Sequence, residues 1–418
     1  MTPEIRVTAS SEVHAALSAI GRAEDVKFSP DNRRVAIAGF VKNELLIVDV
    51  NIEDSADGKH AVLSNCVTIH SPHLHQPHGL AFLGNQALIV TNRLAESVVL
   101  PVPPPDSASP CVVPTLQTIR ADGSHYLRSP GSVESRSIAP DLYEVLICSN
   151  AANYVTRHVL DAREHHSILG EEILLMEGID LPDGVAVSHT REWIAISNHD
   201  TQCVAMFRNR RGLNHRTRPE GHLVGLHYPH APRFTPDGRF VLVADAGAPY
   251  VRVYASEGDD WVGTRSPAGA IRVMDDATFD RGHTNPYEGG PKGIDITADM
   301  RVCAITSEFR SLAFFDLELA LAGVGTTRPH GTPGQSGHEP PASGDTHRGH
   351  PDGVAEVARE ALVRELLREA ATDARMADLK STLDARHARE MEQLQRSRSW
   401  RMTAPLRKVN GWLRSWKH

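Results

Sequence analysis

The sequence has few cysteines and no long apolar segment. Its five cysteines, Cys66, Cys111, Cys148, Cys203 and Cys303, are dispersed and form no CxxC pair, which argues against a disulfide framework and a zinc ribbon. No stretch of about 18 residues is apolar throughout, so no membrane-spanning helix is expected. The first residues lack the basic and apolar regions of a secretory signal. We therefore expect a cytoplasmic chain with reduced thiols.

Two catalytic signatures are also missing. There is no GxxxxGK[ST] phosphate loop and no GxSxG nucleophile turn, which leaves P-loop ATPase and α/β-hydrolase functions without support. The net charge of the 418 residues is -8, so the chain as a whole is not expected to bind nucleic acid. Histidine, in contrast, is abundant, with 23 residues.

One pattern of turns and apolar strands recurs six times. Val-rich and Ile-rich segments of alternating polarity, separated by Asp, Asn, Gly and Pro turns, are typical of half-buried strands. The first unit has four such segments, residues 25–29, 34–40, 44–50 and 62–69. Corresponding positions in successive units lie 47 to 62 residues apart and are Glu24, His78, Gly131, Asp183, His230 and Lys292.

Units of about four strands repeated at this spacing predict an all-β fold, a β-propeller over residues 1–322. Six blades are expected, and a seventh would require a degenerate blade in residues 103–127 or 258–290. The last unit shows three strands, so residues 4–9 or 14–20 are expected to supply its fourth and close the ring. No amphipathic helix falls between the strands, which argues against a parallel α/β fold.

Two of the units carry a more specific pattern. Residues 229–254 read PHAPRFTPDGRFVLVADAGAPYVRVY, and residues 290–309 read GPKGIDITADMRVCAITSEF. These stretches resemble the repeats of the lactonase-like, YVTN-type β-propellers of the 6-phosphogluconolactonase type. The resemblance implies a propeller and suggests lactone hydrolysis. His230 and Glu308 match family residues, whereas Lys292 stands where Arg is usual, Gly293 replaces a second His, and the family has seven blades.

The turns that enter the blades carry the candidate site. In a propeller the first strand of each blade lines the central channel, so these turns share one mouth. His230 next to Asp183 is a candidate general base, and Lys292 could stabilise an anion. The other candidates are Glu308 as a catalytic residue and Glu24, His78 and Arg233 as ligand-binding residues. The alternative is structural, because short turns favour Asp, Gly and Pro for backbone reasons alone.

The loop that contains His70, His73, His75 and His78 is a candidate metal site, because imidazoles at this spacing can ligate zinc or nickel. No HExxH motif and no fixed acidic ligand accompany them. His78 and His230 are three blades apart, so one ion is not expected to reach both. We predict no metal ligands and no cofactor, with a divalent metal as the alternative.

A second polar series ends the second strands of the units. Its members are Asn92, Asn150, Asn198 and Asp245. Their regularity predicts a structural hydrogen-bonding role rather than a site.

The composition changes after residue 322. Residues 323–353 are rich in Gly, Pro, His and Ser, which predicts a disordered linker. Residues 354–397 are rich in Ala, Leu, Glu and Arg and contain no Gly or Pro, which predicts a long helix. The helix could form a short coiled coil and an oligomer, and a solvated single helix is the alternative.

Residues 398–418 form a basic tail, and residues 396–418 contain seven Arg or Lys, three Trp and no Asp or Glu. A basic amphipathic segment with tryptophans is typical of contact with an anionic membrane. A protein partner or a solvated terminus are the alternatives. The candidate contacts are Trp400, Arg401, Arg407, Trp412, Arg414 and Trp416.

The tail also carries a short resemblance. Residues 397–407, SRSWRMTAPLR, are similar to the SxSWRxTxPLR tails of bacterial glycosyltransferases and related proteins of cell-surface polysaccharide synthesis. The resemblance implies that setting, peripheral to the inner membrane, and not glycosyltransferase activity.

Two functions therefore compete. The first is a scaffold propeller that binds a protein partner or a saccharide-type ligand at the channel mouth in a polysaccharide context. The second is a sugar-lactone hydrolase that uses the ring of His, acidic and Lys side chains.

Overall fold

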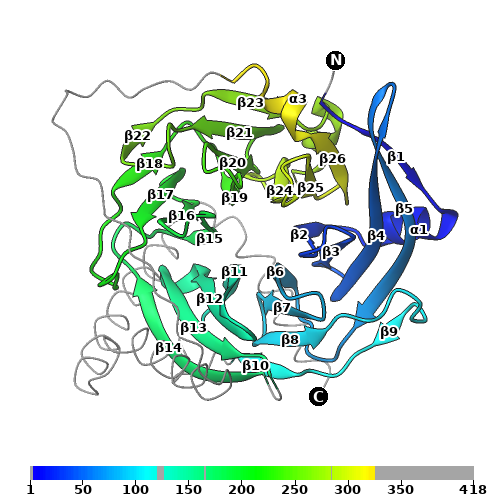
Figure 1. Cartoon of the computed structure of the whole chain (residues 1–418), viewed down its shortest axis with the longest axis horizontal. Helices are drawn as coiled ribbons and strands as arrows, with labels where there is room; N and C mark the ends of the chain where they lie inside the picture. The colour runs from blue at the N-terminus through cyan, green and yellow to red at the C-terminus, as the bar shows by residue number, and fades with distance from the viewer. Residues whose placement is uncertain (1–2, 120–126, 164–165, 284, 325–418) are drawn as a thin grey trace, which may run out of the picture. The chain divides into compact units, whose positions relative to one another are not determined.

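Six sheets of mainly antiparallel strands surround a central axis in the computed structural model (Figure 1). The structure describes residues 3–119, 127–163, 166–283 and 285–324. Within each sheet the strands follow one another in sequence from the axis outward, except that a strand from the N-terminal residues adds to the outer edge of the first sheet. This arrangement is a six-bladed β-propeller and confirms the predicted fold class.

The first three blades each contain four antiparallel strands in the order of the sequence. Blade 1 contains β2 (Ala23–Phe28), β3 (Arg34–Gly39), β4 (Glu44–Ser55) and β5 (Gly58–His70). Blade 2 contains β6 (Pro77–Leu83), β7 (Ala87–Asn92), β8 (Ser97–Pro101) and β10 (Gln117–Ile119). Blade 3 contains β11 (Pro130–Ala139), β12 (Leu142–Ser149), β13 (Tyr154–Asp161) and β14 (Ser167–Leu175).

The last three blades follow the same order. Blade 4 contains β15 (Pro182–Val187), β16 (Trp193–Asn198), β17 (Cys203–Arg208) and β18 (Gly221–Leu223), with β22 (Gly263–Arg265) at its edge. Blade 5 contains β19 (Pro229–Phe234), β20 (Phe240–Asp245), β21 (Tyr250–Ala255) and β23 (Gly269–Arg272). Blade 6 contains β24 (Pro291–Ile296), β25 (Val302–Ser307) and β26 (Ala313–Asp316).

The two stretches considered for a seventh blade belong to other sheets. Residues 103–127 contain β9 (Cys111–Val112), which pairs with β5, and β10, which completes blade 2. Residues 258–290 contain β22, β23 and the short helix α2 (Asp276–Arg281). The described residues therefore form six blades and no seventh.

The N-terminal residues close the ring between blades 6 and 1. Glu4 pairs with Phe315, and the Ile5 N–H donates to the Phe314 carbonyl at 3.0 Å, so this segment adds to blade 6. The next residues form β1 (Arg6–Ala9), which pairs with β5 of blade 1 in parallel. The expected closure by residues 4–9 is thus divided between two blades.

Residues 14–20, the other segment expected to close the ring, are not a strand. They lie in and just after helix α1 (Ser11–Ala19), where the Ser10 side chain caps the helix by accepting from the Val13 N–H. The buried face of α1 is limited to Val13, which packs with Ile20 and residues of both closing blades.

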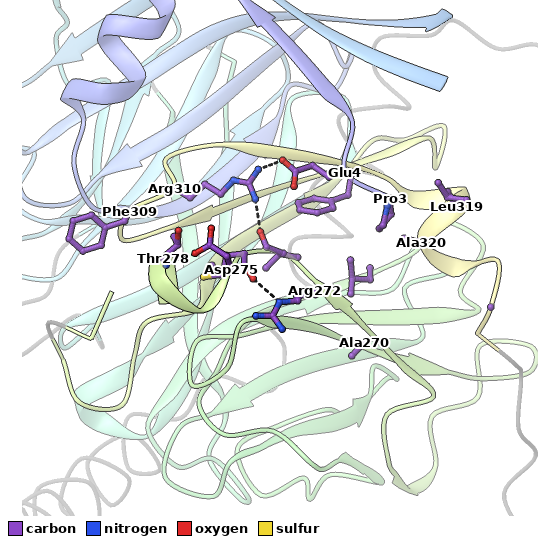
Figure 2. A pocket seen from close by; sticks show the side chains of 15 residues that line it. Pro3, Glu4, Ala270, Arg272, Asp275, Thr278, Phe309, Arg310, Leu319 and Ala320 are labelled. Carbon is purple, nitrogen blue, oxygen red and sulfur yellow. Dashed lines mark hydrogen bonds and ion pairs between the residues drawn. The ribbon is translucent and has the colours of Figure 1, made fainter. Parts of the chain in front are cut away.

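A groove of about 920 Å³ adjoins this closure. Arg310 lines this groove beside Glu4 (Figure 2), and its guanidinium donates to the Glu4 carboxylate and to the Val273 carbonyl, the latter at 2.6 Å. The wall is completed by α2 and by the end of the short helix α3 (Leu317–Leu321). The groove therefore belongs to the seam between blades and not to the channel.

The apolar core lies between neighbouring blades. At the closure, for example, Val26 of blade 1 packs with Val302 and Phe314 of blade 6, and all three side chains are fully buried. Full burial of a side chain of this kind stabilises the fold by roughly 1.5–3 kcal/mol. Blade-to-blade packing of this kind holds the inner strands in place around the axis.

The inner strands share one irregularity that shapes the channel. Each has a register shift at its start; in blade 4, Asp183 and Gly184 lie between the pairs Pro182–Asn198 and Val185–Ile196. Such a bulge turns its side chain away from the regular pleat. A Cβ on Gly184 would lie 2.2 Å from the His230 carbonyl oxygen. The glycine therefore permits a close approach of adjacent inner strands and a narrow channel mouth.

The remainder of the chain lies outside the described residues. Almost all of the predicted linker, and the whole of the predicted long helix and tail, fall on residues 325–418. No helix in the part of the chain that the structure describes is both long and apolar enough to cross a membrane.

Candidate functional site

The predicted entry-turn residues converge at one mouth of the channel. Glu24, His78, Asp183 and His230 are buried, with at most 4% of each exposed, and Lys292 is fully buried. His78 and His230 come from opposite blades, yet their rings stack with centroids 5.9 Å apart. The expectation that these two histidines are too far apart to share a ligand is wrong, because the inner strands approach closely.

Asp183 is the centre of one half of this mouth cluster. Its Oδ2 lies 3.0 Å from His230 Nδ1 and 3.7 Å from His199 Nε2. Its Oδ1 accepts from the Arg93 guanidinium. The same Arg93 Nη2 lies 2.9 Å from His78 Nε2. Because a guanidinium only donates, His78 accepts through Nε2 and carries its proton on Nδ1.

Glu24 is the centre of the other half. Its carboxylate pairs with Arg22, and its Oε2 lies 3.5 Å from Lys292 Nζ. Lys292 also donates to Glu288, and Arg22 Nη2 lies 3.1 Å from the same Glu288 carboxylate. The buried ammonium is thus held by two carboxylates. Lys292 therefore neutralises carboxylate charge within the cluster, which is one form of the anion stabilisation expected from the sequence.

Burial and neighbouring charges fix the protonation of the cluster. Burial alone would raise the pKa of Glu24, but Lys292 and Arg22 hold that pKa well below its usual range. Burial would likewise raise the pKa of Asp183, and His230, His78 and Arg93 hold it low. Burial lowers the pKa of His78 and of His199 to about 3 in each case. At neutral pH the carboxylates are therefore ionised and these two imidazoles are neutral.

Several members of the cluster were not found from the sequence. Arg93 and His199 each follow the last residue of the second strand of a blade, and Glu308 holds the same position in blade 6. The recognised series of Asn92, Asn198 and Asp245 lies one position earlier. The residue after each member of that series is also a repeat position, and this position could have been used to find Arg93 and His199. Arg22 and Glu288 lie in connecting segments without a repeat position, and no periodic signal marks them.

The polar series at the strand ends positions the cluster. Asn198 accepts from the Asp180 N–H at 3.1 Å, and Asp245 accepts from the N–H groups of His227 and Tyr228 at 3.0 and 2.9 Å. These bonds hold the loops that lead to Asp183 and His230. Asn92 does the same for the loop before His78. Asn150 departs from the pattern, because it begins a short 3-10 turn and donates to the Pro182 carbonyl.

Arg233 does not join the mouth cluster. It lies three residues beyond His230 on β19, where its Nε is 3.2 Å from Asp295 and its Nη1 is 3.8 Å from Glu134. Lys27 occupies the equivalent position of blade 1 and pairs with Asp25 at 2.6 Å. These residues form a second, deeper ring of paired charges. The predicted ligand contact by Arg233 would therefore have to occur away from the mouth.

Glu308 lies at the solvent side of the cluster. Its Oε2 is 3.4 Å from Arg22 Nε, and the side chains of Glu308 and Arg22 are 12% and 18% exposed. Both residues line a groove of about 1220 Å³ between α1 and blade 6. This groove gives solvent access to the edge of a cluster that is otherwise buried.

Two groups of side chains in the cluster have the geometry of metal ligands. They are Glu24, His78 and His230, and Asp183, His199 and His230, and in each the ligand atoms lie within 4.8 Å of one another. The loop histidines His70, His73 and His75 belong to neither group. The crowded loop is therefore not where the structure gathers ligands, although His78 at its end is part of the cluster.

Comparisons with known proteins give no family. No family model and no curated protein matches the chain. A chain of the mitotic checkpoint complex is similar with a TM-score of 0.43 and 11% identity over 70% of this chain and 76% of that chain. A protein of unknown function from Desulfotomaculum acetoxidans DSM 771 is similar with a TM-score of 0.44 and 13% identity over 71% and 83%. The assignment of the fold rests on the strand pairing described above.

The charge balance of the cluster can be tested with Lys292→Met, which keeps the apolar stem and removes the ammonium. Glu24 and Glu288 would lose a buried partner, and breaking a buried ion pair costs about 3–5 kcal/mol. We expect the free energy of unfolding in urea at pH 7 to fall by that amount. Without Lys292 the carboxyl groups of Glu24 and Glu288 protonate more readily in the folded state. The loss of free energy of unfolding relative to the unaltered chain should therefore become smaller as the pH is lowered from 7 to 5.

The matched control is Arg272→Met, which breaks the exposed ion pair with Asp276, whose side chains are 47% and 79% exposed. It should cost at most about 1 kcal/mol. An equal loss in the Lys292 variant at both pH values would contradict the proposed charge balance.

Proposed function

We propose that this protein is a binding propeller whose channel mouth and adjoining groove hold a small polyhydroxylated ligand of the saccharide type. The observation that carries the proposal is the groove between α1 and blade 6, which reaches Arg22 and Glu308 of the buried cluster. The wall of the groove thus contains a cation and a carboxylate side by side. Burial would lower the pKa of Arg22, but Glu24 and Glu288 raise it, whereas burial raises the pKa of Glu308 and Arg22 opposes that rise.

The pairing of Arg22 and Glu308 suits a vicinal diol. The guanidinium donates to one hydroxyl oxygen, and the carboxylate accepts from a neighbouring hydroxyl. Glu308 Oε2 is buried and has no hydrogen-bond partner within the described ranges. It therefore offers an unsatisfied acceptor to a ligand hydroxyl.

An exposed aromatic ring completes the groove. Phe309 lines it and is 52% exposed. The apolar face of a sugar ring can pack on such a side chain, while the hydroxyl groups at the ring edge reach Arg22 and Glu308. A charged pair beside an exposed aromatic ring favours a saccharide over a purely apolar ligand.

Binding of D-glucuronate and D-galactose to the full chain, measured by calorimetry, tests this function. We expect one of these sugars to bind, and Phe309→Ala and Glu308→Gln each to weaken its dissociation constant about tenfold, through loss of the stacking surface or of a charged acceptor.

The control for these variants is Leu319→Ala. Leu319 is exposed and lines the neighbouring groove of Figure 2, which shares Phe309 with the sugar groove, but it does not itself line the sugar groove. The control variant should leave sugar binding unchanged. Failure of both sugars to bind the folded protein, or equal weakening by all three variants, would overturn the proposal.

The setting of surface-polysaccharide synthesis is supported by the tail. Residues 397–407 have the residue pattern described for such proteins, and residues 396–418 carry seven basic residues and three tryptophans without an acidic residue. Membrane contact is favoured over a protein partner, because tryptophan together with basic residues suits the interface of an anionic bilayer. The tail would then hold the binding propeller at the membrane surface.

Vesicle flotation of the full chain tests the tail. We expect binding to vesicles that contain phosphatidylglycerol, weaker binding to pure phosphatidylcholine, and loss of binding in the variant Trp412→Ala with Trp416→Ala, because the interfacial anchors are gone. Absence of binding by the unaltered chain would overturn the membrane role and favour the protein partner.

A second candidate function, lactone hydrolysis, is favoured by the pair Asp183 and His230. The carboxylate lies 3.0 Å from Nδ1, and Nε2 is buried without a hydrogen-bond partner in the described ranges. A carboxylate on one nitrogen and a free second nitrogen is the arrangement of a general base. Nε2 would take a proton from water as the water oxygen adds to the lactone carbonyl carbon. The imidazolium would then return that proton to the ring oxygen as the ring C–O bond breaks, which gives the hydroxy acid.

Acid release from D-glucono-δ-lactone, followed in a pH-stat against the uncatalysed rate, tests this candidate. His230→Gln should lower the enzymatic rate by about 10²- to 10⁴-fold, because the general base is lost. His227→Gln, an exposed histidine whose ring lies 3.4 Å from Asp245, is the control and should keep the rate. Turnover no faster than the uncatalysed reaction would exclude the lactonase function for this substrate.

A further inference from the structure

His199 has an environment that its protein neighbours do not explain. Its Nε2 is buried and has no hydrogen-bond partner in the part of the chain that the structure describes. The nearest carboxylate oxygen, Asp183 Oδ2, lies 3.7 Å away, beyond the usual length of a hydrogen bond. A protonated Nε2 would be unsatisfied, and an unprotonated Nε2 would face an anion. A cation between the two atoms would satisfy both.

His230 completes the surroundings of that position. Its Nδ1 lies 3.0 Å from the same Asp183 Oδ2. The ring centroids of His199 and His230 are 5.0 Å apart. Around a tetrahedral zinc ion with ligands at about 2.0–2.2 Å, ligand atoms lie roughly 3.3–3.6 Å from one another. The two distances to Oδ2 lie on either side of that range, so small side-chain movements would complete the site.

We propose that Asp183, His199 and His230 bind one divalent transition-metal ion of the zinc class at the channel mouth. Two imidazoles and one carboxylate are a ligand set used for such ions, and they leave a fourth position for water or for a ligand oxygen. The inference deepens the proposed function, since a hydroxyl or carbonyl oxygen of the bound sugar or lactone would take the fourth position.

The surrounding residues hold these ligands in place. Arg93 binds Oδ1 of Asp183 and leaves Oδ2 for the ion. Tyr228 stacks on the His199 ring with centroids 3.9 Å apart. Outer contacts of this kind fix the orientation of metal ligands.

The charges of the cluster also accommodate a cation. Its four carboxylates, from Glu24, Asp183, Glu288 and Glu308, face the three cations Arg22, Arg93 and Lys292. One negative charge therefore remains without a matching cation among these described residues.

The second group of possible ligands, Glu24, His78 and His230, is less suitable. His78 Nε2 already accepts from Arg93 at 2.9 Å. Glu24 is held by Arg22 and Lys292. An ion in that position would have to displace three cationic contacts, so His78 supports the site through Arg93 and is not itself a ligand.

Cobalt binding to the full chain, stripped of metal with a chelator, tests the site without any sugar or lactone present. We expect one Co²⁺ with the visible absorption of a tetrahedral ion, displaced by Zn²⁺. His199→Phe keeps the stacking on Tyr228 but removes a ligand, and Asp183→Asn removes the carboxylate. Each should abolish the absorption band and weaken binding by more than about 100-fold, whereas His78→Gln should keep the band and weaken binding by about 10- to 100-fold, as loss of an outer contact does.

The crowded loop provides the control. A variant with His70, His73 and His75 all changed to Gln should retain the absorption band. Any cobalt bound by histidines outside the described residues would be the same in every variant and would not affect the comparison. Loss of the band in the loop variant, its persistence in both ligand variants, or no cobalt uptake by the unaltered chain would overturn the proposal. Sugar binding in the metal-stripped protein is measured separately, so failure of the metal site and failure of the binding function can be told apart.

Discussion

The close approach of the inner strands is the constraint on which the site depends. Glycine at the bulge, as at Gly184 beside the His230 carbonyl, lets neighbouring blades approach in a way that no larger residue would allow. The narrow mouth then forces charged and imidazole side chains from opposite blades into one buried volume. Burial of charge is costly unless each charge is paired. The alternating carboxylates and cations of the cluster are the result of that requirement.

The fold was predictable because its signal is periodic. Strand alternation and turn residues recur in every unit, so the entry position of each unit followed from spacing alone, and six blades were expected with a seventh left open until the strand pairing excluded it for the described residues. The same period located Glu24, His78, Asp183, His230 and Lys292, which the structure brings together. What a period cannot give is the diameter of the channel, and for that reason the proximity of His78 and His230 was not foreseen.

The errors have equally specific causes. Arg233 was assigned to the mouth because it lies near His230 in sequence, but three residues along an inner strand lead to a deeper ring, where Asp295 binds it. Arg22 and Glu288 occupy connecting segments, which no repeat aligns. The sequence offers residues 4–9 or 14–20 as the closing strand, whereas residues 4–9 pair with two blades and Ser10 caps a helix that contains most of residues 14–20. In each case a local or tertiary contact determines where the residue lies, and the composition of the sequence carries no signal for that contact.

The closure between the first and last blades has a consequence for the order of folding. Glu4 pairs with Phe315, so this residue has to wait for a partner that is synthesised about three hundred residues later. Contacts of such sequence separation form late because of the loop entropy they must overcome. Blade 1 can pair its own strands early, but the face that packs against blade 6 stays exposed to solvent until blade 6 has been synthesised. The nascent chain therefore presents an open arc of blades until blade 6 has been synthesised, and the strands of blade 6 convert that arc into a ring.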